Sequence, residues 1–184
     1  MKSEIVFEAY RAVCLTKSKS LGPRIIALLT AEIVIAKSTA DSSDQLIFAA
    51  AEELSDAELE EFSEFALSWA ARSQAEKHKD IEVCDGGGLR IQIADQTLDS
   101  NWIKGESIPV GPLDLANDIG SWAPKLKRLG LISDDVRERQ WRYKEDGERH
   151  IDEPGVAREI TWWLFLSKQS QILATLVRRA SAGK

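Results

Sequence analysis

The chain has 184 residues, of which 43% are hydrophobic and 29% are charged, and its formal net charge is −6. These proportions are ordinary for a globular protein, and a chain of this length can bury enough apolar surface to fold without a metal or disulfide staple. An acidic surface repels phosphate backbones, so the overall charge argues against nucleic acid as a partner. We expect one domain over residues 1–184, in which 1–79 could form a helical sub-lobe and 80–184 an α+β sub-lobe.

The sequence has no feature that predicts export or membrane insertion. Acidic residues interrupt the apolar ones at the N-terminus, and no stretch approaches the ~18 consecutive apolar residues of a membrane helix. Cys14 and Cys84 lie 70 positions apart, which favours free, buried thiols in a reducing compartment. We therefore expect a cytoplasmic protein without a membrane partner.

The first part of the chain is predicted to be helical. Val6, Tyr10 and Val13 recur at helical spacing within residues 3–17, so we expect them to form the apolar face of a first helix. A Gly-Pro pair opens a second apolar run at 25–36, which is typical of a helix with proline in its first turn. The β-branched residues of this run leave a strand as the alternative.

Two segments match the capping-box pattern, in which a serine and a glutamate or glutamine three residues later each accept a hydrogen bond from the other's backbone N–H. They are residues 42–45 and 55–58. The second opens the most regular predicted helix, at 56–78, which has an apolar and an acidic face. The apolar stripe of this helix consists of Leu59, Phe62, Ala66, Trp69, Ala70 and Ser73.

A change of periodicity at residue 80 predicts β-structure. Residues 81–84 and 89–93 alternate with period two around the glycine-rich segment 85–88. This pattern indicates an antiparallel hairpin, because glycine readily adopts the positive φ of a hairpin turn. The Gly and Pro residues of 95–112 then indicate an irregular loop.

The last part of the chain is predicted to mix short helices, a hairpin and a long helix. We expect helices at 113–120 and 122–129, and a second hairpin within 139–151. Residues 156–180 read as a long terminal helix, although the run 162–166 is apolar on every side and leaves a central strand as the alternative. The predicted fold class is α+β and predominantly α-helical, a helical bundle with a small antiparallel β-hairpin.

One pair of residues near the end of the 56–78 helix has catalytic potential. Arg72 and His78 are separated by five residues, a spacing that resembles the arginine–histidine motif of HEPN-family ribonucleases. The resemblance covers seven residues and implies a helical bundle in which Arg72 stabilises the phosphate transition state while His78 acts as acid or base. A HEPN-like ribonuclease that uses these two residues is therefore one alternative function.

A second resemblance concerns nucleic-acid binding. Residues 113–120 and 126–132 look like the middle of a winged helix-turn-helix domain, with 139–151 in the place of the wing. The resemblance implies a winged-helix-like C-terminal half and a nucleic-acid-binding regulator, although winged helices also bind proteins. The basic residues that would contact nucleic acid are Lys125, Lys127, Arg128, Arg142 and Lys144.

The remaining reactive residues form no complete motif. The triglycine segment lacks the Lys-Ser/Thr ending of a P-loop, and neither CxxC nor HxxxH spacing occurs. The helical pattern places the many carboxylates of 52–64 on a solvated face, whereas an acid–base pair needs a cleft. We therefore expect no cofactor and no metal, and we lean towards a protein that is not an enzyme.

Charge and aromatic residues instead favour an interaction protein. Residues 41–65 contain nine acidic and no basic residues, whereas 125–144 contain seven basic and three acidic ones. Aromatic and arginine side chains are typical of interaction hot spots. The sequence predicts binding to another protein or self-association, as an accessory or regulatory subunit, an antitoxin or immunity-type inhibitor, or a component of a larger assembly. The residues predicted to make the contacts are Trp141, Arg139, Arg142, Tyr143, Trp102 and Trp122.

Overall fold

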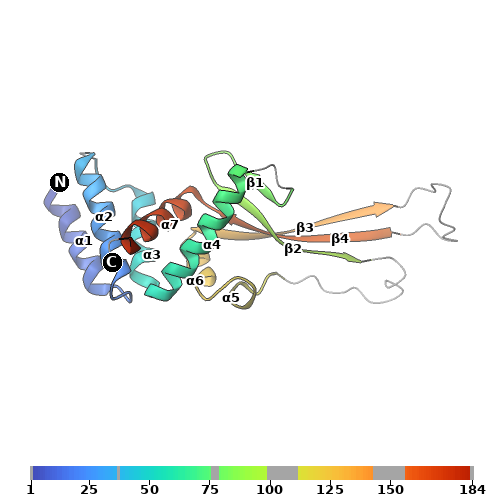
Figure 1. Ribbon diagram of the computed structural model, residues 1–184, viewed down its shortest axis with the longest axis horizontal. Helices are drawn as coiled ribbons and strands as arrows, with labels where there is room; N and C mark the ends of the chain where they lie inside the picture. Colours follow the sequence, from blue (N-terminus) through green and yellow to red (C-terminus); the bar gives the residue numbers. More distant parts are fainter. Residues whose placement is uncertain (1, 37, 76–78, 99–111, 143–155, 183–184) are drawn as a thin grey trace.

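The fold is described by a computed structural model for residues 2–36, 38–75, 79–98, 112–142 and 156–182 (Figure 1). Within these ranges it contains seven helices and a four-stranded antiparallel sheet, which confirms the predicted α+β, predominantly helical class. The helices are α1 (Lys2–Leu15), α2 (Leu21–Ile35), α3 (Ser42–Glu53), α4 (Asp56–Ala75), α5 (Leu115–Asp118), α6 (Trp122–Arg128) and α7 (Lys168–Ser181). The strands are β1 (Ile81–Val83), β2 (Leu89–Leu98), β3 (Ile132–Arg142) and β4 (Val156–Leu166).

The molecule is elongated, with a helical body at one end and a projecting sheet at the other (Figure 1). Helices α1 to α4 and α7 pack together in the body, and β2, β3 and β4 extend away from it as an arm. The last two strands have 11 residues each, which corresponds to roughly 35 Å of extended chain. Among the described residues, no helix is long and apolar enough to cross a membrane.

One connected hydrophobic core runs through the body and the root of the sheet. It includes residues from Ile5 in α1 to Ala180 in α7, so helices from both predicted sub-lobes contribute to it. Helix α7 lies between α2 and α4, and the buried Ser63 hydroxyl of α4 donates a 2.9 Å hydrogen bond to the carbonyl oxygen of Ala174 in α7. Burial of this apolar cluster is the main force that holds the helices together.

The sheet has the order β1-β2-β4-β3, so β4 is a central strand. The predicted helix at 156–180 is therefore wrong over Val156–Leu166, where the alternative of a central strand is correct, and α7 forms only after Ser167. The run of bulky residues suits this position, because β4 has strand neighbours on both edges and Trp163 and Leu164, on opposite faces of the strand, are both buried.

The first hairpin is confirmed by the pairing of β1 with β2. Gly86 and Gly87 adopt φ values of 85° and 84° in its turn, a region that glycine enters without a steric penalty. Strand β2 continues to Leu98, so the loop predicted at 95–112 begins later than expected. Of the second predicted hairpin, only 139–142 lie in the described part of the chain, where they belong to β3.

The two short helices are confirmed as α5 and α6, with Pro124 in the first turn of α6. Strands β3 and β4 pair antiparallel after them, in the order expected of a wing. They are nevertheless part of the larger sheet, because β4 also pairs with β2 over most of its length. The winged-helix resemblance stays a prediction.

Of the two predicted capping boxes, the one at α4 is confirmed and the one at α3 is shifted by one residue. Helix α3 begins one residue earlier than expected: the cap is Asp41, whose carboxylate accepts hydrogen bonds from the N–H groups of Ser43 and Asp44 at 2.8 and 2.9 Å. At α4 the prediction is confirmed, since the Ser55 N–H donates to Glu58 at 2.9 Å and the Glu58 N–H donates to the Ser55 hydroxyl at 3.3 Å.

Of the apolar face predicted for the first helix, Val6 and Tyr10 lie on the solvent side, whereas Val13 is partly buried against the core. The core-facing residues of α1 are Ile5, Ala9 and Ala12, whereas Val6 is 54% and Tyr10 is 69% exposed. Small alanines let α1 pack closely on its neighbours, which leaves the larger apolar residues outside. The expected burial of the cysteines is also wrong for Cys14, which is exposed on the same helix, while Cys84 is half-buried.

Candidate interaction surfaces

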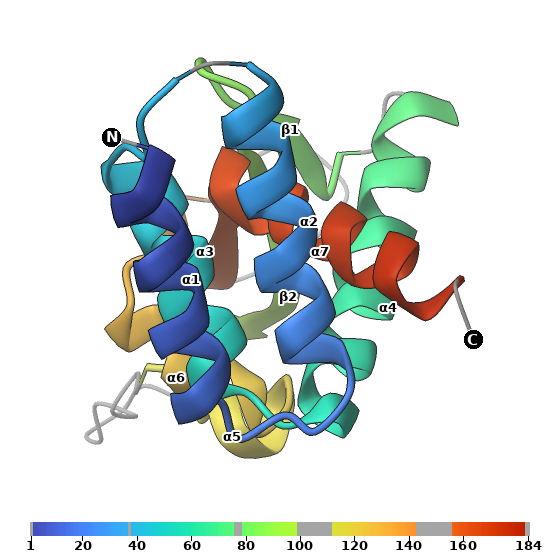
Figure 2. The same ribbon diagram turned by 90° about the vertical axis from the view of Figure 1, so that its left-hand side faces the viewer.

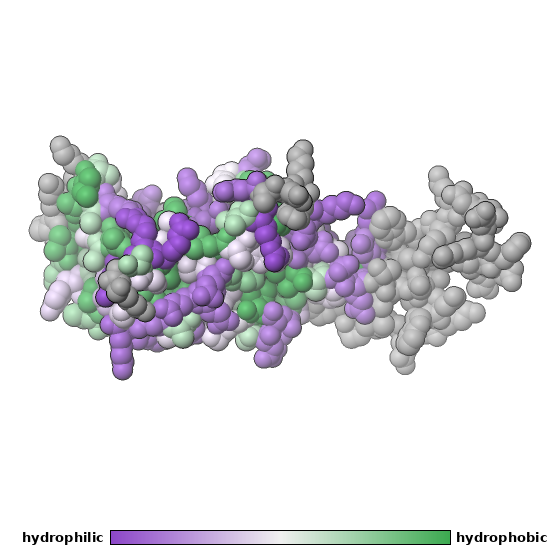
Figure 3. All heavy atoms as spheres, in the orientation of Figure 1, coloured by the Kyte–Doolittle hydropathy of each residue, from purple (hydrophilic) through white to green (hydrophobic). Residues whose placement is uncertain are grey.

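Helix α1 has a second apolar face at the end of the molecule. We name Val6, Phe7, Tyr10 and Cys14 the α1 outer face; a spacing of 100° per residue places them on one side of the helix. Phe7 is 70% exposed and Tyr10 is 69% exposed. Figure 2 looks directly at this end, where α1 and α2 lie in front of the other helices, and apolar atoms are visible there in Figure 3. Single exposed apolar residues are common, but a contiguous group with two aromatics is unusual for a free surface.

Polar contacts hold α1 firmly on the body. Directly after α1, the Thr16 hydroxyl donates to the Ala51 carbonyl oxygen at 2.7 Å, and the Lys17 N–H donates to the Glu52 carbonyl oxygen at 2.8 Å. Near the middle of the helix, Gln45 of α3 donates to the Glu8 carboxylate at 3.2 Å. The α1 outer face is therefore presented on a fixed element and not on a loose tail.

The connection from α1 to α2 is anchored by one carboxylate at the start of α4. The Asp56 side chain accepts hydrogen bonds from the Ser18 hydroxyl and from the Leu21 N–H, the latter at 2.9 Å. Partial burial raises the pKa of Asp56, but the hydrogen bonds from Ser18 and from the backbone N–H groups of Leu21, Ser20 and Lys19 outweigh it and lower the pKa below 3.8. The carboxylate is thus ionised near neutral pH, where it makes its strongest hydrogen bonds.

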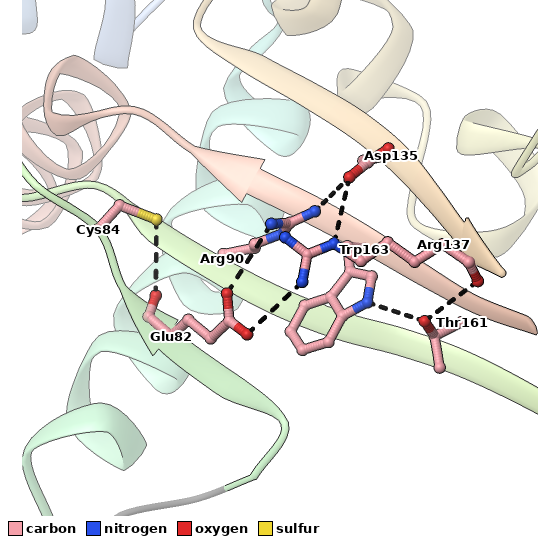
Figure 4. A network of polar contacts seen from close by, with 7 residues as sticks. All are labelled: Glu82, Cys84, Arg90, Asp135, Arg137, Thr161 and Trp163. Atoms are coloured by element: carbon pink, nitrogen blue, oxygen red, sulfur yellow. Dashed lines mark hydrogen bonds and ion pairs between the residues drawn. The ribbon is translucent and has the colours of Figure 1, made fainter. Parts of the chain in front are cut away.

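On one face of the sheet, the guanidinium groups of two arginines lie next to each other over the indole of Trp163 (Figure 4). The guanidinium carbons of Arg90 and Arg137 lie 5.2 and 5.6 Å from the ring centroid, and Trp163 is only 6% exposed. Both arginines form ion pairs with Glu82 and Asp135 from the two outer strands. The two positive and two negative groups give the network no net charge. The arginines cover the indole, and the ion pairs link all four strands of the sheet.

The remaining residues of the predicted aromatic–arginine cluster are only partly described. Arg139 is exposed on β3, opposite Glu159 of β4. Trp141 and Arg142 are paired positions of β3, opposite Ala157 and Val156. Tyr143 and Trp102 lie outside the described residues. Their proposed contacts stay a prediction.

Trp122 is a correction to the predicted contact residues. Its side chain is fully buried, and its ring centroid lies 5.1 Å from that of Phe62 and 5.3 Å from that of Phe65. The residue is a core aromatic and is not available to a partner. The sequence alone does not show whether a tryptophan at the start of a short helix is buried in the core or exposed to a partner.

The basic residues of α6 are engaged within the molecule. Lys125 pairs with Glu58 at 2.5 Å, Lys127 pairs with Asp134 at 2.5 Å, and Arg128 pairs with Glu53. Two of these acidic partners come from the acidic segment 41–65, so the two oppositely charged segments meet inside one chain. Of the other nucleic-acid candidates, Arg142 is described only as a strand position, and Lys144 lies outside the described residues.

The Lys125–Glu58 pair is the most strongly perturbed of these contacts. The Glu58 side chain is 12% exposed. Burial disfavours its charged form, but hydrogen bonds from Lys125, from the Ser55 N–H and hydroxyl and from Ser121 outweigh that effect and lower the pKa of Glu58 from 4.5 to about 2. The ionised carboxylate thus fastens α6 to the first turn of α4.

Among the described residues, Arg72 has an aromatic neighbour: its guanidinium carbon lies 4.9 Å from the ring centroid of Trp69, on the exposed end of α4. His78 lies outside the described residues, so the Arg72–His78 pair stays a prediction. A cleft of about 490 Å³ lies beside β2 and α5, and its described lining includes a single carboxylate and no histidine, cysteine, lysine or arginine. Its lining residues are Ile93, Ala94, Pro112, Leu113, Asp118 and Trp162.

Neither metal-ligating side chains nor a match to a known protein assigns a chemistry to the described residues. Within the described ranges, no group of three or more His, Cys, Asp or Glu side chains could hold a metal ion. No protein-family model matches the chain, and comparisons with curated proteins and with solved structures give no significant match. The interpretation of function therefore depends on the surfaces described above.

Proposed function

We propose that this chain is a non-enzymatic protein–protein interaction protein, acting as an accessory or regulatory subunit, an antitoxin or immunity-type inhibitor, or a component of a larger assembly. The observation that carries the proposal is the α1 outer face, where Phe7 and Tyr10 are 70% and 69% exposed on a helix fixed to the body. Removing such apolar area from water favours association, and aromatic residues on rigid elements are typical interaction anchors.

Two further observations favour a protein partner over nucleic acid. On the sheet face that carries Trp163, the two arginines are paired with Glu82 and Asp135. The described basic residues of α6 are paired with carboxylates as well. Ligands of strong charge, such as nucleic acid, would have to break these pairs before they could bind. No observation among the described residues favours the ribonuclease or the nucleic-acid-binding alternative over a protein partner.

The test is a comparison of tagged variants in affinity capture from lysate of the source cells. Phe7→Glu and Tyr10→Glu place a charge on the α1 outer face, while Val83→Glu is the matched control, because Val83 is 69% exposed on β1. We expect wild type and Val83→Glu to retain the same partner, identified by mass spectrometry, and both α1 variants to lose it. Equal capture by all four proteins, or capture by none, would remove the support for this function.

A further inference from the structure

We propose that the partner of the α1 outer face is a second copy of this chain, bound through an antiparallel pair of α1 helices across a twofold axis near Tyr10. The inference rests on the proposed function, since it names the partner of the same surface. Two features of α1 carry it: the apolar area that it exposes and the arrangement of large and small residues along it.

The exposed apolar area is sufficient for a dimer. Val6, Phe7 and Tyr10 are 54%, 70% and 69% exposed. Fully exposed aromatic side chains present about 150–250 Å² and aliphatic ones roughly 60–120 Å², so these residues expose on the order of 300 Å² per copy. Two copies would bury roughly 600 Å² of apolar surface, which corresponds to a total of roughly 1,000 Å² because about 60% of an interface is apolar. That total reaches the roughly 1,000 Å² that a specific interface should bury.

The residues of the α1 outer face complement themselves in an antiparallel pair. Phe7 and Cys14 are two helical turns apart on the same side of α1, with Tyr10 between them. A twofold axis near Tyr10 therefore places the large Phe7 ring of each copy against the small Cys14 side chain of the other. The two Tyr10 rings meet at the centre, where interaction hot spots cluster.

Helix α2 continues the apolar surface beside α1. Ala27 and Ala31 are exposed on α2, and Ile35 at its end is 80% exposed. The end of the body seen in Figure 2 is formed by these two helices, with no other described element in front of them. A second copy can therefore approach α1 without a steric obstacle from the described chain.

The first measurement is the molar mass of the purified chain over a concentration series, by sedimentation or light scattering. We expect wild type and Val83→Glu to dimerise, and Phe7→Glu to raise the dimer dissociation constant about a hundredfold or more, because one substitution places two charges in the interface. A wild-type chain that is monomeric at roughly 100 µM, a weak dissociation constant for a specific complex, overturns the inference. So does a dimer that Phe7→Glu leaves unchanged.

The second measurement uses the two cysteines as built-in reporters. Cys14 is exposed on α1, while Cys84 is half-buried next to β1 and serves as the internal reference. Alkylation of Cys14, followed by mass spectrometry, should slow as the protein concentration rises through the dimer range, and Cys84 should react at a constant rate. Concentration-independent alkylation of Cys14 in a dimeric sample places the interface elsewhere.

The outcomes separate this inference from the proposed function. A monomeric wild type that captures a different protein through Phe7 contradicts self-association but keeps the interaction function. A monomeric wild type that captures nothing contradicts both.

Discussion

Substitution of Glu58 by glutamine tests how strongly the first turn of α4 is fastened to α6. Glutamine keeps the size of the side chain and can still accept the hydrogen bond from the Ser55 N–H, so Glu58→Gln mainly removes the charge opposite Lys125. The pKa of Glu58 is lowered from 4.5 to about 2, so its ionised carboxylate contributes about 3 kcal/mol to the free energy of unfolding. Because Lys125 is 30% exposed and partly screened by solvent, we expect a loss of about 2 kcal/mol in the free energy of unfolding at pH 7.

The same linkage sets a pH dependence with a definite sign. The folded pKa of Glu58 lies below the unfolded value, so its contribution is complete above about pH 5 and is lost as the pH falls towards 2. The stability gap between wild type and Glu58→Gln should therefore shrink by roughly a third to a half between pH 7 and pH 3.5.

The assay is urea unfolding at a series of pH values, followed by circular dichroism. Glu64→Gln is the control, because Glu64 is exposed on the same helix, and it should change stability by less than about 0.5 kcal/mol. A gap for Glu58→Gln that is no larger than that of the control, or that stays constant from pH 7 to pH 3.5, refutes the reasoning.

Four further substitutions have expected outcomes that urea unfolding can check. Gly88→Ala should cost about 1–3 kcal/mol, because an added Cβ would lie 2.6 Å from ring atoms of Phe165, whereas Gly87→Ala should cost only about 1 kcal/mol, through its φ of +84°. Asp56→Ala should cost about 1–3 kcal/mol, since it leaves N–H groups of the α1–α2 connection without their acceptor. Arg90→Gln should cost about 1 kcal/mol and red-shift the tryptophan fluorescence, because it uncovers the buried indole of β4; an unchanged spectrum would contradict the proposed shielding.

The parts of the fold that the sequence predicted well are those where local chemistry decides the structure. The serine–glutamate box at Ser55 and Glu58 forms as expected, because capping needs only residues three apart. The turn at Gly86 and Gly87 forms because few other residues tolerate its positive φ.

The parts that were predicted wrongly depend on tertiary neighbours. The apolar run of β4 is compatible with a buried helix, and only its pairing with β2 and β3 makes it a strand. Helix α1 has apolar residues on two sides, so periodicity could not show that Ala9 and Ala12 face the core while Tyr10 faces solvent. The two-sided pattern was itself the signal for the α1 outer face, since a helix buried on one side needs apolar residues on that side only.

The ion pairs of α6 could not be foreseen for a similar reason. The charge counts showed an acidic segment and a basic one, and this suggested contacts between molecules. The fold brings Glu53 and Glu58 against α6, so part of the opposite charge is satisfied within one chain. Charge segregation along a sequence therefore predicts attraction but does not say whether the two segments meet within one molecule or between two.

The position of β4 and α7 has a consequence for the order in which the chain can fold. Before residues 156–181 have been synthesised, β2 and β3 lack the strand that joins them, and α2 and α4 lack the helix between them. A nascent chain would therefore hold exposed apolar helix faces and an unpaired eleven-residue strand until residues 156–181 leave the ribosome. Contacts this distant in sequence form slowly, so the protein should be most prone to aggregation during synthesis, and a chaperone that covers α2 and β3 at that stage should raise its yield.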